Sequence, residues 1–278
     1  MKHALRFTLI ALLILLAVPT TLAAEEDNSF RWAGEELYFS VRISGAEAMR
    51  AGLRTGQVQE RDGRPFVPIT GMARSRGLFE AIYPLDDRAN TYVQPSTFLP
   101  IRSEKIFEEA GKRRTYFVDY RHRRFEADVE RERDDRSTRF NAPIPEGTHD
   151  MLTWIYHFRT NGNSLSIGDE FTYYIYDGWL LTRLILEVVE RDEILTPMGW
   201  FMTWKVHFTR QIMDVNRTYR SSSDNPPTPP NLGVRERARH TGHLWFSRDE
   251  NLIPVQLTIP TMLGYGEAVL IRYEPASP

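Results

Sequence analysis

The residues best suited to chemistry lie in one short segment, between positions 148 and 160. His149 and Asp150 stand side by side near its start, and Tyr156 and Arg159 follow. A histidine beside an aspartate could serve as a base with the group that orients it, and an arginine could clamp an anion. The simpler interpretation is that Asp150 caps a helix beside an exposed His149, and we favour it.

Arg159 needs a negatively charged partner if its helix is buried, because an unpaired buried charge is very costly. Asp86, Asp87 and Asp169 are the candidate partners. We favour a buried ion pair that fixes the helix to a sheet over an anchor for a ligand. The residues that we select as candidates for a binding site are Arg159, Tyr156, Asp150, Asp86, Arg88 and Trp245.

Three other patterns carry weaker signals. His240 and His243 are three positions apart, but on a strand this spacing points the two side chains to opposite faces, so we predict no metal site. The basic turn at 121–124 could recognise phosphates or acidic glycans, although charged turns are usually only solvated. Five tryptophans could line a sugar platform or belong to the core, and we favour the core. They are Trp154, Trp179, Trp200, Trp204 and Trp245.

Signatures of catalysis are missing from the sequence. There is no cysteine, so a thiol nucleophile is excluded, and stability cannot come from disulfides. Neither a Gly-x-Ser-x-Gly motif nor a glycine-rich phosphate loop occurs. We therefore predict no catalytic residue, no metal and no cofactor.

Most of the chain alternates apolar and polar residues with the period of two that is typical of half-buried strands. Segment 36–44 alternates in this way, and Asp-Gly pairs at 62–63 and 177–178 signal hairpin turns. The predicted fold class is therefore mainly β, an antiparallel curved sheet or half-barrel of about ten to twelve strands. The segments with strand character are 36–44, 48–59, 64–74, 89–94, 101–108, the hairpin 114–132, 171–176, 180–191, 193–196, 200–210, 243–247, 252–259 and 265–273.

One convincing helix is expected, over 148–160, with Thr148 as its N-cap. Its apolar residues recur at the i, i+3, i+4 and i+7 spacing, and two more widen the stripe. A helix with so wide an apolar surface must be buried on more than one side, so we place it in the concave face of the curved sheet. The stripe consists of Met151, Trp154, Ile155 and Phe158, widened by Leu152 and Tyr156.

Residues 1–23 have the pattern of a cleaved export signal: a basic start, an apolar run over 7–18 and small residues up to Ala23. Cleavage near Ala23 would leave one β-rich domain, 24–278, in the periplasm, with a proline-rich loop near 221–233. With 35 Lys and Arg against 37 Asp and Glu, the chain is close to neutral, so we expect no nucleic-acid partner. No later segment is long and apolar enough to predict a membrane span.

Several short motifs occur together, in a characteristic order. They are Gly77-Leu78-Phe79, Tyr83-Pro84-Leu85-Asp86-Asp87-Arg88, Phe98-Leu99-Pro100, Pro145-Glu146-Gly147, Asp150-Met151-Leu152, Tyr156-His157-Phe158-Arg159, Gly168-Asp169, Thr196-Pro197-Met198-Gly199, Leu244-Trp245-Phe246-Ser247-Arg248-Asp249 and Ile253-Pro254-Val255. With them, the chain from Gly34 to about Tyr273 resembles the bacterial exported proteins grouped as domain of unknown function 3108 (DUF3108). The resemblance implies a cell-envelope location and an antiparallel β fold around helix, but no activity. The stretch 221–233 departs from the family as an insertion.

A wide apolar helix facing a curved, aromatic-rich sheet predicts a groove. We therefore expect a periplasmic binding or carrier module for an apolar or amphiphilic envelope component, with a lipid or glycan as the possible ligand. The first alternative is a structural partner in an envelope complex, which would need an exposed sheet edge or apolar patch. The second is a glycan-processing enzyme, which would need two titratable groups converging in a cleft.

Overall fold

A computed structural model describes residues 30–133, 136–215, 228–261 and 264–276. Its strands form one antiparallel sheet, in the order β10-β11-β12-β13-β14-β15-β1-β2-β4-β5-β6-β7-β8-β9, with β3 paired to β4. The strands are β1 Glu36–Ile43, β2 Ala46–Thr55, β3 Gln59–Arg61, β4 Arg64–Ser75, β5 Leu85–Val93, β6 Pro100–Glu109, β7 Lys112–Arg121, β8 Glu126–Arg133, β9 Arg136–Pro143, β10 Glu170–Tyr176, β11 Leu181–Thr196, β12 Gly199–Val215, β13 Leu232–Ser247, β14 Pro254–Thr261 and β15 Gly264–Glu274.

The predicted fold class is confirmed, but the sheet has fifteen strands in the described residues, more than the expected ten to twelve. β3 and β9 were not predicted from the sequence. β9 is an edge strand whose first six residues are all exposed, so it lacks the apolar alternation by which buried strands are found. A strand of this kind is held by the backbone ladder to β8 and leaves no hydrophobic pattern.

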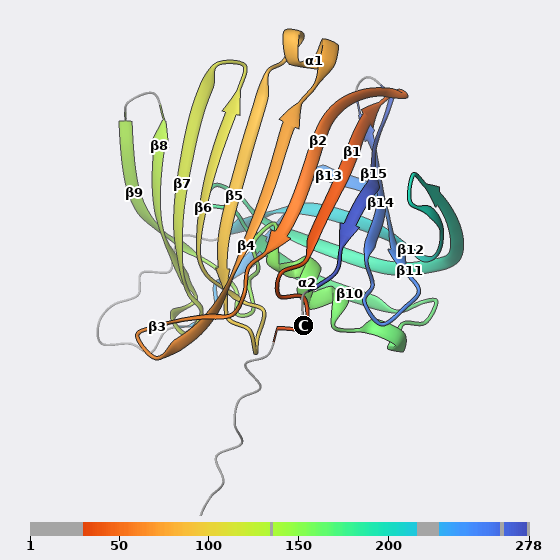
Figure 1. The fold of residues 1–278 in the computed structure, drawn as a ribbon. Coiled ribbons are helices and arrows are strands. Elements are labelled where there is room, and N and C mark those ends of the chain that lie inside the picture. Colours follow the sequence, from red (N-terminus) through yellow and green to blue (C-terminus); the bar gives the residue numbers. More distant parts are fainter. Residues whose placement is uncertain (1–29, 134–135, 216–227, 262–263, 277–278) are drawn as a thin grey trace, which may run out of the picture.

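The sheet curves around a short helix, α2 (Thr153–Arg159), which Figure 1 shows inside the curve. Tyr156 belongs to a core cluster with residues of β1, β2, β4 and β5, whereas Phe158 belongs to a second cluster with residues of β10, β11, β12 and β13. The helix is therefore buried on two sides, as its wide apolar stripe predicted.

The helix begins at Thr153, later than predicted, and its N-cap position is Leu152, not Thr148. The Asp150 carboxylate accepts hydrogen bonds from the backbone N–H groups of Leu152, at 3.0 Å, and Thr153, at 2.9 Å. The Thr148 hydroxyl instead donates to the carbonyl of Pro145. The predicted N-cap was wrong, although the capping role of Asp150 was right.

The two ends of the sheet meet by packing, and no strand pairing between β9 and β10 is found in the described residues. A third core cluster joins residues of β7, β8 and β9 to Tyr176 of β10, Leu181 of β11 and Met213 of β12. The Tyr120 hydroxyl also donates to the Tyr176 carbonyl at 2.7 Å. The structure is therefore a half-barrel whose ends are in contact through side chains.

Two expectations fall partly or wholly outside the described residues. The predicted export signal, 1–23, lies outside them, as does most of the predicted proline-rich loop. The end of that loop was placed too late, since β13 already begins at Leu232. A second, shorter helix, α1 (Gly77–Ile82), connects β4 to β5.

Candidate functional site

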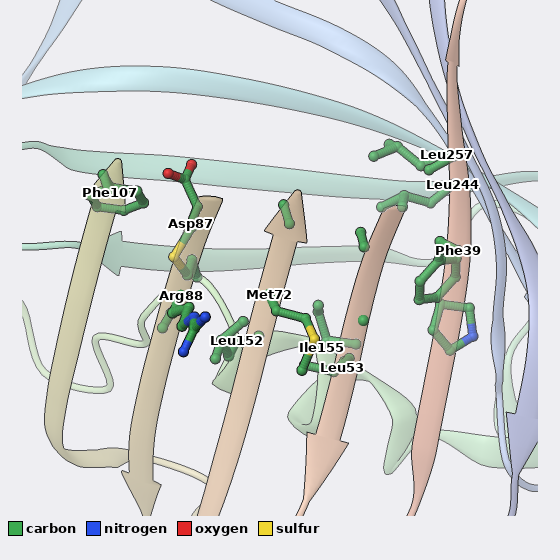
Figure 2. Close-up of a pocket in the computed structure, with 18 of the residues that line it drawn as sticks. Phe39, Leu53, Met72, Asp87, Arg88, Phe107, Leu152, Ile155, Leu244 and Leu257 are labelled. Carbon is green, nitrogen blue, oxygen red and sulfur yellow. The ribbon is translucent and has the colours of Figure 1, made fainter. Parts of the chain in front are cut away.

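The concave face holds an apolar cavity of about 330 Å³ between α2 and the sheet. Figure 2 shows it bounded by residues of β1, β2, β5 and β6 and by Leu152 and Ile155. Leu244 of β13 and Leu257 of β14 line the other side. The lining residues are mainly apolar and include Phe39, Ala51, Leu53, Gly71, Ala73, Ala89, Phe107, Met151, Leu152, Ile155, Leu244, Leu257 and Ala268.

Small residues on neighbouring strands create this space. Ala51 of β2 pairs with Ala73 of β4, and Gly71 of β4 pairs with Ala89 of β5, so four small residues share the inner face of three strands. At Gly71 the reason for the small residue is visible, because a Cβ there would lie 2.9 Å from Leu152 Cδ2. Gly71 lets the segment before α2 approach the sheet, and the small side chains of the alanines leave room for the cavity.

Asp87 is the one acidic residue among those that line the cavity. Its carboxylate accepts a hydrogen bond from the backbone N–H of Glu108 at 3.1 Å. Partial burial, together with the nearby charge of Glu109, raises the pKa of Asp87 to about 6. Glu109 itself forms an ion pair with Arg114. The cavity therefore has one acidic group on a mainly apolar wall, which also includes Arg88 and Gln256.

Below the cavity, a buried ionic cluster fixes the segment that leads into α2. Lys105 Nζ lies 2.8 Å from Asp177 Oδ1 and 3.8 Å from Asp150 Oδ2, and the Thr91 hydroxyl donates to Asp150. Asp177 also accepts the backbone N–H of Met151 at 3.0 Å. Because Lys105 and Asp150 are fully buried and Asp177 nearly so, this cluster holds the cavity floor in place and is closed to solvent.

Arg159 is fully buried and makes a two-pronged ion pair with Glu35, with both N–O distances at 2.6 Å. Its Nε donates to the carbonyl of Asn251 at 2.9 Å, and its guanidinium lies 4.8 Å from the ring of Trp32. A buried ion pair was the favoured interpretation and the structure contains one. The predicted partners, Asp86, Asp87 and Asp169, were wrong, because the partner precedes β1 and was not considered.

The six residues selected from the sequence do not converge on one site. Asp150, Tyr156 and Arg159 all lie at α2, but each is buried in the core or in an ionic cluster. Burial, followed by the charge of Glu35, raises the pKa of Tyr156 well above its usual value, so its hydroxyl stays protonated. These three residues position the helix and do not reach a ligand.

The other three selected residues lie apart from α2. Arg88 and Asp86 of β5 contact each other at 3.4 Å, and Asp86 also pairs with Arg74. Asp86 and Arg88 alternate with Asp87 along β5, and Arg88 is nevertheless among the residues that line the cavity, as Figure 2 shows. Trp245 of β13 is buried, and its indole N–H donates to Asp192 at 2.9 Å.

In the described residues, the pair His240 and His243 gathers no further possible metal ligand. His149, which was predicted to be exposed, is buried, with its Nδ1 3.1 Å from the Thr153 hydroxyl. Burial and the neighbouring His157 lower the pKa of His149 to about 3, so it is uncharged. His243 lies beside His207 of β12, with 5.1 Å between ring centres. Within the described ranges, no group of three possible ligands comes together.

The remaining sequence candidates are also dispersed. Trp204 and Trp245 are buried, whereas Trp200 lies exposed at the end of the β11–β12 hairpin, so the tryptophans form no common platform. In the basic turn, Arg121 pairs with Asp128, and Arg124 pairs with Glu126. Local ion pairs thus neutralise part of its charge, in agreement with the simpler interpretation.

A groove at the helix was predicted, but most of the residues that line and support the cavity were not. The small lining residues carry no signal of their own, because alanine and glycine fit many environments. Lys105 could have been found, since it occupies an inward position of β6 between Ser103 and Phe107, where a charged side chain needs partners. Asp177 could not, because an Asp-Gly pair predicts a turn and gives no reason to expect a buried ion pair.

Fold and site together define an open antiparallel half-barrel with one internal helix and an apolar cavity. The model of the family "Protein of unknown function (DUF3108)" matches residues 37–271. The chain therefore belongs to the DUF3108 family, as its motifs indicated. No curated protein matches it.

Three solved structures are similar to the chain. A β-barrel-like protein of domain of unknown function DUF1849 from Brucella abortus has a TM-score of 0.53 at 8% identity, over 89% of this chain and 100% of that one. This likeness concerns the fold alone. A candidate lipoprotein from Parabacteroides distasonis and a candidate exported protein with a YmcC-like fold from Bacteroides fragilis have TM-scores of 0.33 and 0.34. Each is 12% identical over 88% of this chain and 97% of its own, and at these TM-scores neither carries an argument.

Proposed function

We propose that this protein is an exported, periplasmic binding or carrier protein that holds the apolar part of an envelope component in its concave cavity. The observation that carries the proposal is the cavity itself, about 330 Å³ of space lined by apolar side chains between α2 and the sheet. Cavities that bind small molecules are usually concave, mostly apolar and formed before the ligand arrives.

The size of the cavity suits one hydrocarbon chain. At about 30 Å³ for each water-sized group, 330 Å³ holds about eleven such groups. Each buried methylene contributes roughly 0.8 kcal/mol, which for a chain of this length exceeds the lower estimates of the cost of association. The burial of a single chain can therefore support stable binding.

Two buried ionic clusters support a preformed cavity. Glu35 and Arg159 hold α2 at its end, while Lys105 with Asp150 and Asp177 holds the segment before it. Both clusters join elements that are distant in the sequence. They hold the helix in a fixed position beside the cavity, so little reorganisation is needed when a ligand binds.

The proposed location rests on the sequence. The basic start, apolar run and small residues of 1–23 are typical of an export signal. In the part of the chain that the structure describes, no helix is long and apolar enough to cross a membrane.

Mass spectrometry of the protein purified from a native periplasm tests the proposal. We expect a lipid-like molecule at one copy per chain, released on denaturation. Ala51→Phe, which fills the cavity, should lose it, whereas Ala46→Phe on an exposed position of the same strand should keep it. An empty wild-type protein, or equal loading of the two variants, would contradict the proposal.

A structural role in an envelope complex is the second candidate, favoured by the end of the β11–β12 hairpin. This end extends past its neighbours, because β12 pairs with β13 only from Thr203 onward, and Figure 1 shows it reaching outward. Leu195 and Trp200 face each other there and are 61% and 69% exposed. Pull-down with wild type and with Trp200→Ser would test it, and equal recovery of partners would count against it.

The glycan-processing alternative receives no support from the residues on which it depended. Tyr156, His149 and Arg159, which were to act as acid, base and anion clamp, are all buried, and none of them lines the cavity.

A further inference from the structure

We propose, on the basis of the proposed function, that the ligand is a single-chain amphiphile whose head group carries an ammonium, and that Asp87 and Phe107 bind this head group. The apolar chain lies in the cavity toward α2. Amphiphiles with a carboxylate head are rejected.

The position of Asp87 gives the cavity a polar end and an apolar end. Asp87 and Phe107 are direct partners on β5 and β6, and both line the cavity. Figure 2 shows them together at one end, whereas Leu152 and Ile155 lie toward the other. A chain that extends toward α2 therefore leaves its head group beside Asp87.

The charged groups near this end leave the Asp87 carboxylate uncompensated. Glu109 is paired with Arg114, and Arg88, which also lines the cavity, is paired with Asp86 of its own strand. In the described residues no ion pair joins Asp87 to a basic side chain, and its recorded hydrogen bond comes from the backbone of Glu108.

Lys105, the basic residue on the inner face of β6, does not compensate Asp87 either. It is fully buried and paired with Asp177 and Asp150. The polar end of the cavity consequently carries a net negative charge, which attracts an ammonium and repels a carboxylate.

Phe107 adds a second feature that suits an ammonium. The negative face of an aromatic ring attracts a cation, and the attraction strengthens where water is partly excluded. Its ring packs edge-on against Trp179, with 5.4 Å between ring centres, which holds it in place. A carboxylate and an aromatic ring at the mouth of an apolar cavity form a suitable pair for an ammonium head. The raised pKa of Asp87 agrees with this, since its charge lacks a partner in the free protein.

Competition binding tests the head-group preference. Wild-type protein is loaded with the neutral apolar dye N-phenyl-1-naphthylamine at pH 8 and low salt, and dodecylammonium, dodecanol and dodecanoate are titrated as competitors. We expect dodecylammonium to displace the dye at a concentration at least tenfold lower than dodecanol does, and dodecanoate to be weaker than dodecanol.

Two variants assign the preference to Asp87. Asp87→Asn keeps the size of the side chain and an oxygen for the Glu108 N–H, and it should reduce the three competitors to similar strength. Asp86→Asn, on the opposite face, is the matched control and should leave the preference intact.

The outcomes separate the inference from the function on which it rests. Equal displacement by all three competitors in the wild type, or a preference that survives Asp87→Asn, would overturn the head-group assignment while binding itself persists. Failure of the wild type to bind the dye and every competitor would overturn the proposed function as well.

Discussion

Two groups of charged residues on the inner side of the sheet differ in whether each charge has a partner of opposite sign. Around α2, the buried Arg159 and Lys105 are each matched by carboxylates, at 2.6 Å and 2.8 Å. At the other end of the cavity, Asp87 accepts a backbone N–H and has no ion-pair partner among the described residues. Matched buried charges hold elements together, whereas an unmatched charge beside an empty cavity costs stability and is available to a ligand. Replacing a charged side chain by a neutral one should therefore lower the free energy of unfolding around α2 and raise it at Asp87.

The largest effect is expected at Arg159. Arg159→Met leaves Glu35 as a fully buried charge without its partner, which should lower the free energy of unfolding by about 3–5 kcal/mol. Urea denaturation measures this. Replacing both residues, as in Glu35→Gln with Arg159→Met, should recover most of the loss, and Arg88→Met at an exposed position should cost little. If the double variant were no more stable than the single one, the loss would not come from the unpaired charge.

The next largest expected effect is a pH dependence of the free energy of unfolding that comes from His149. Its folded pKa is lowered to about 3, against an ordinary value of 6.5, so the unfolded chain binds more protons between these values. The free energy of unfolding should therefore fall as the pH is lowered from 6.5 toward 3, by up to a few kcal/mol. His149→Asn should flatten this part of the profile, measured by urea denaturation at several pH values. An unchanged slope in the variant would exclude His149 as its source.

A smaller effect of opposite sign is expected at Asp87. Its folded pKa is raised from 3.8 to about 6, so the folded state binds more protons between these values, and stability is lost as the pH rises through 6. Because the side chain is only partly buried, solvent reduces the effect. Asp87→Asn should raise the free energy of unfolding at pH 8 by about 1 kcal/mol. A lower stability of this variant would mean that the carboxylate is structural.

The smallest effect is expected at the exposed pair Asp86 and Arg88. Exposed ion pairs contribute about 0–1 kcal/mol, so Asp86→Asn should change the free energy of unfolding by less than about 0.5 kcal/mol. Thermal unfolding at low and high salt would check this. A loss as large as that of Arg159→Met would show that the outer face also contributes strongly to the fold.

The sequence predicted the fold better than the site, for a physical reason. Alternation of apolar residues reports which side of a strand is buried, and that was enough for the curved sheet and the two-sided burial of α2. It fails for β9, where both faces are largely exposed and the backbone alone supplies the pairing. It also misplaced the start of α2, because the choice of Leu152 over Thr148 as the N-cap position depends on local backbone geometry.

A groove was predicted, but the residues that line the cavity could not be, because the lining results from distances between elements that are far apart in the sequence. Ala51, Ala73 and Ala89 look like ordinary strand residues until the register places them on one face opposite Leu152. The partner of Arg159 was missed for the same reason, since Glu35 lies 124 positions away in the chain. Sequence patterns indicate that a buried charge needs a partner, but only the fold shows which residue it is.

The central claim is that the cavity binds an apolar chain, and a direct titration tests it. The neutral dye N-phenyl-1-naphthylamine is added to delipidated wild-type protein and to Ala73→Phe and Ala46→Phe, and its fluorescence is followed to saturation. We predict one saturable site in the wild type and in Ala46→Phe, with binding at least tenfold weaker in Ala73→Phe, whose new side chain occupies the cavity. Equal affinity in all three proteins, or no saturable binding in the wild type, would contradict the account.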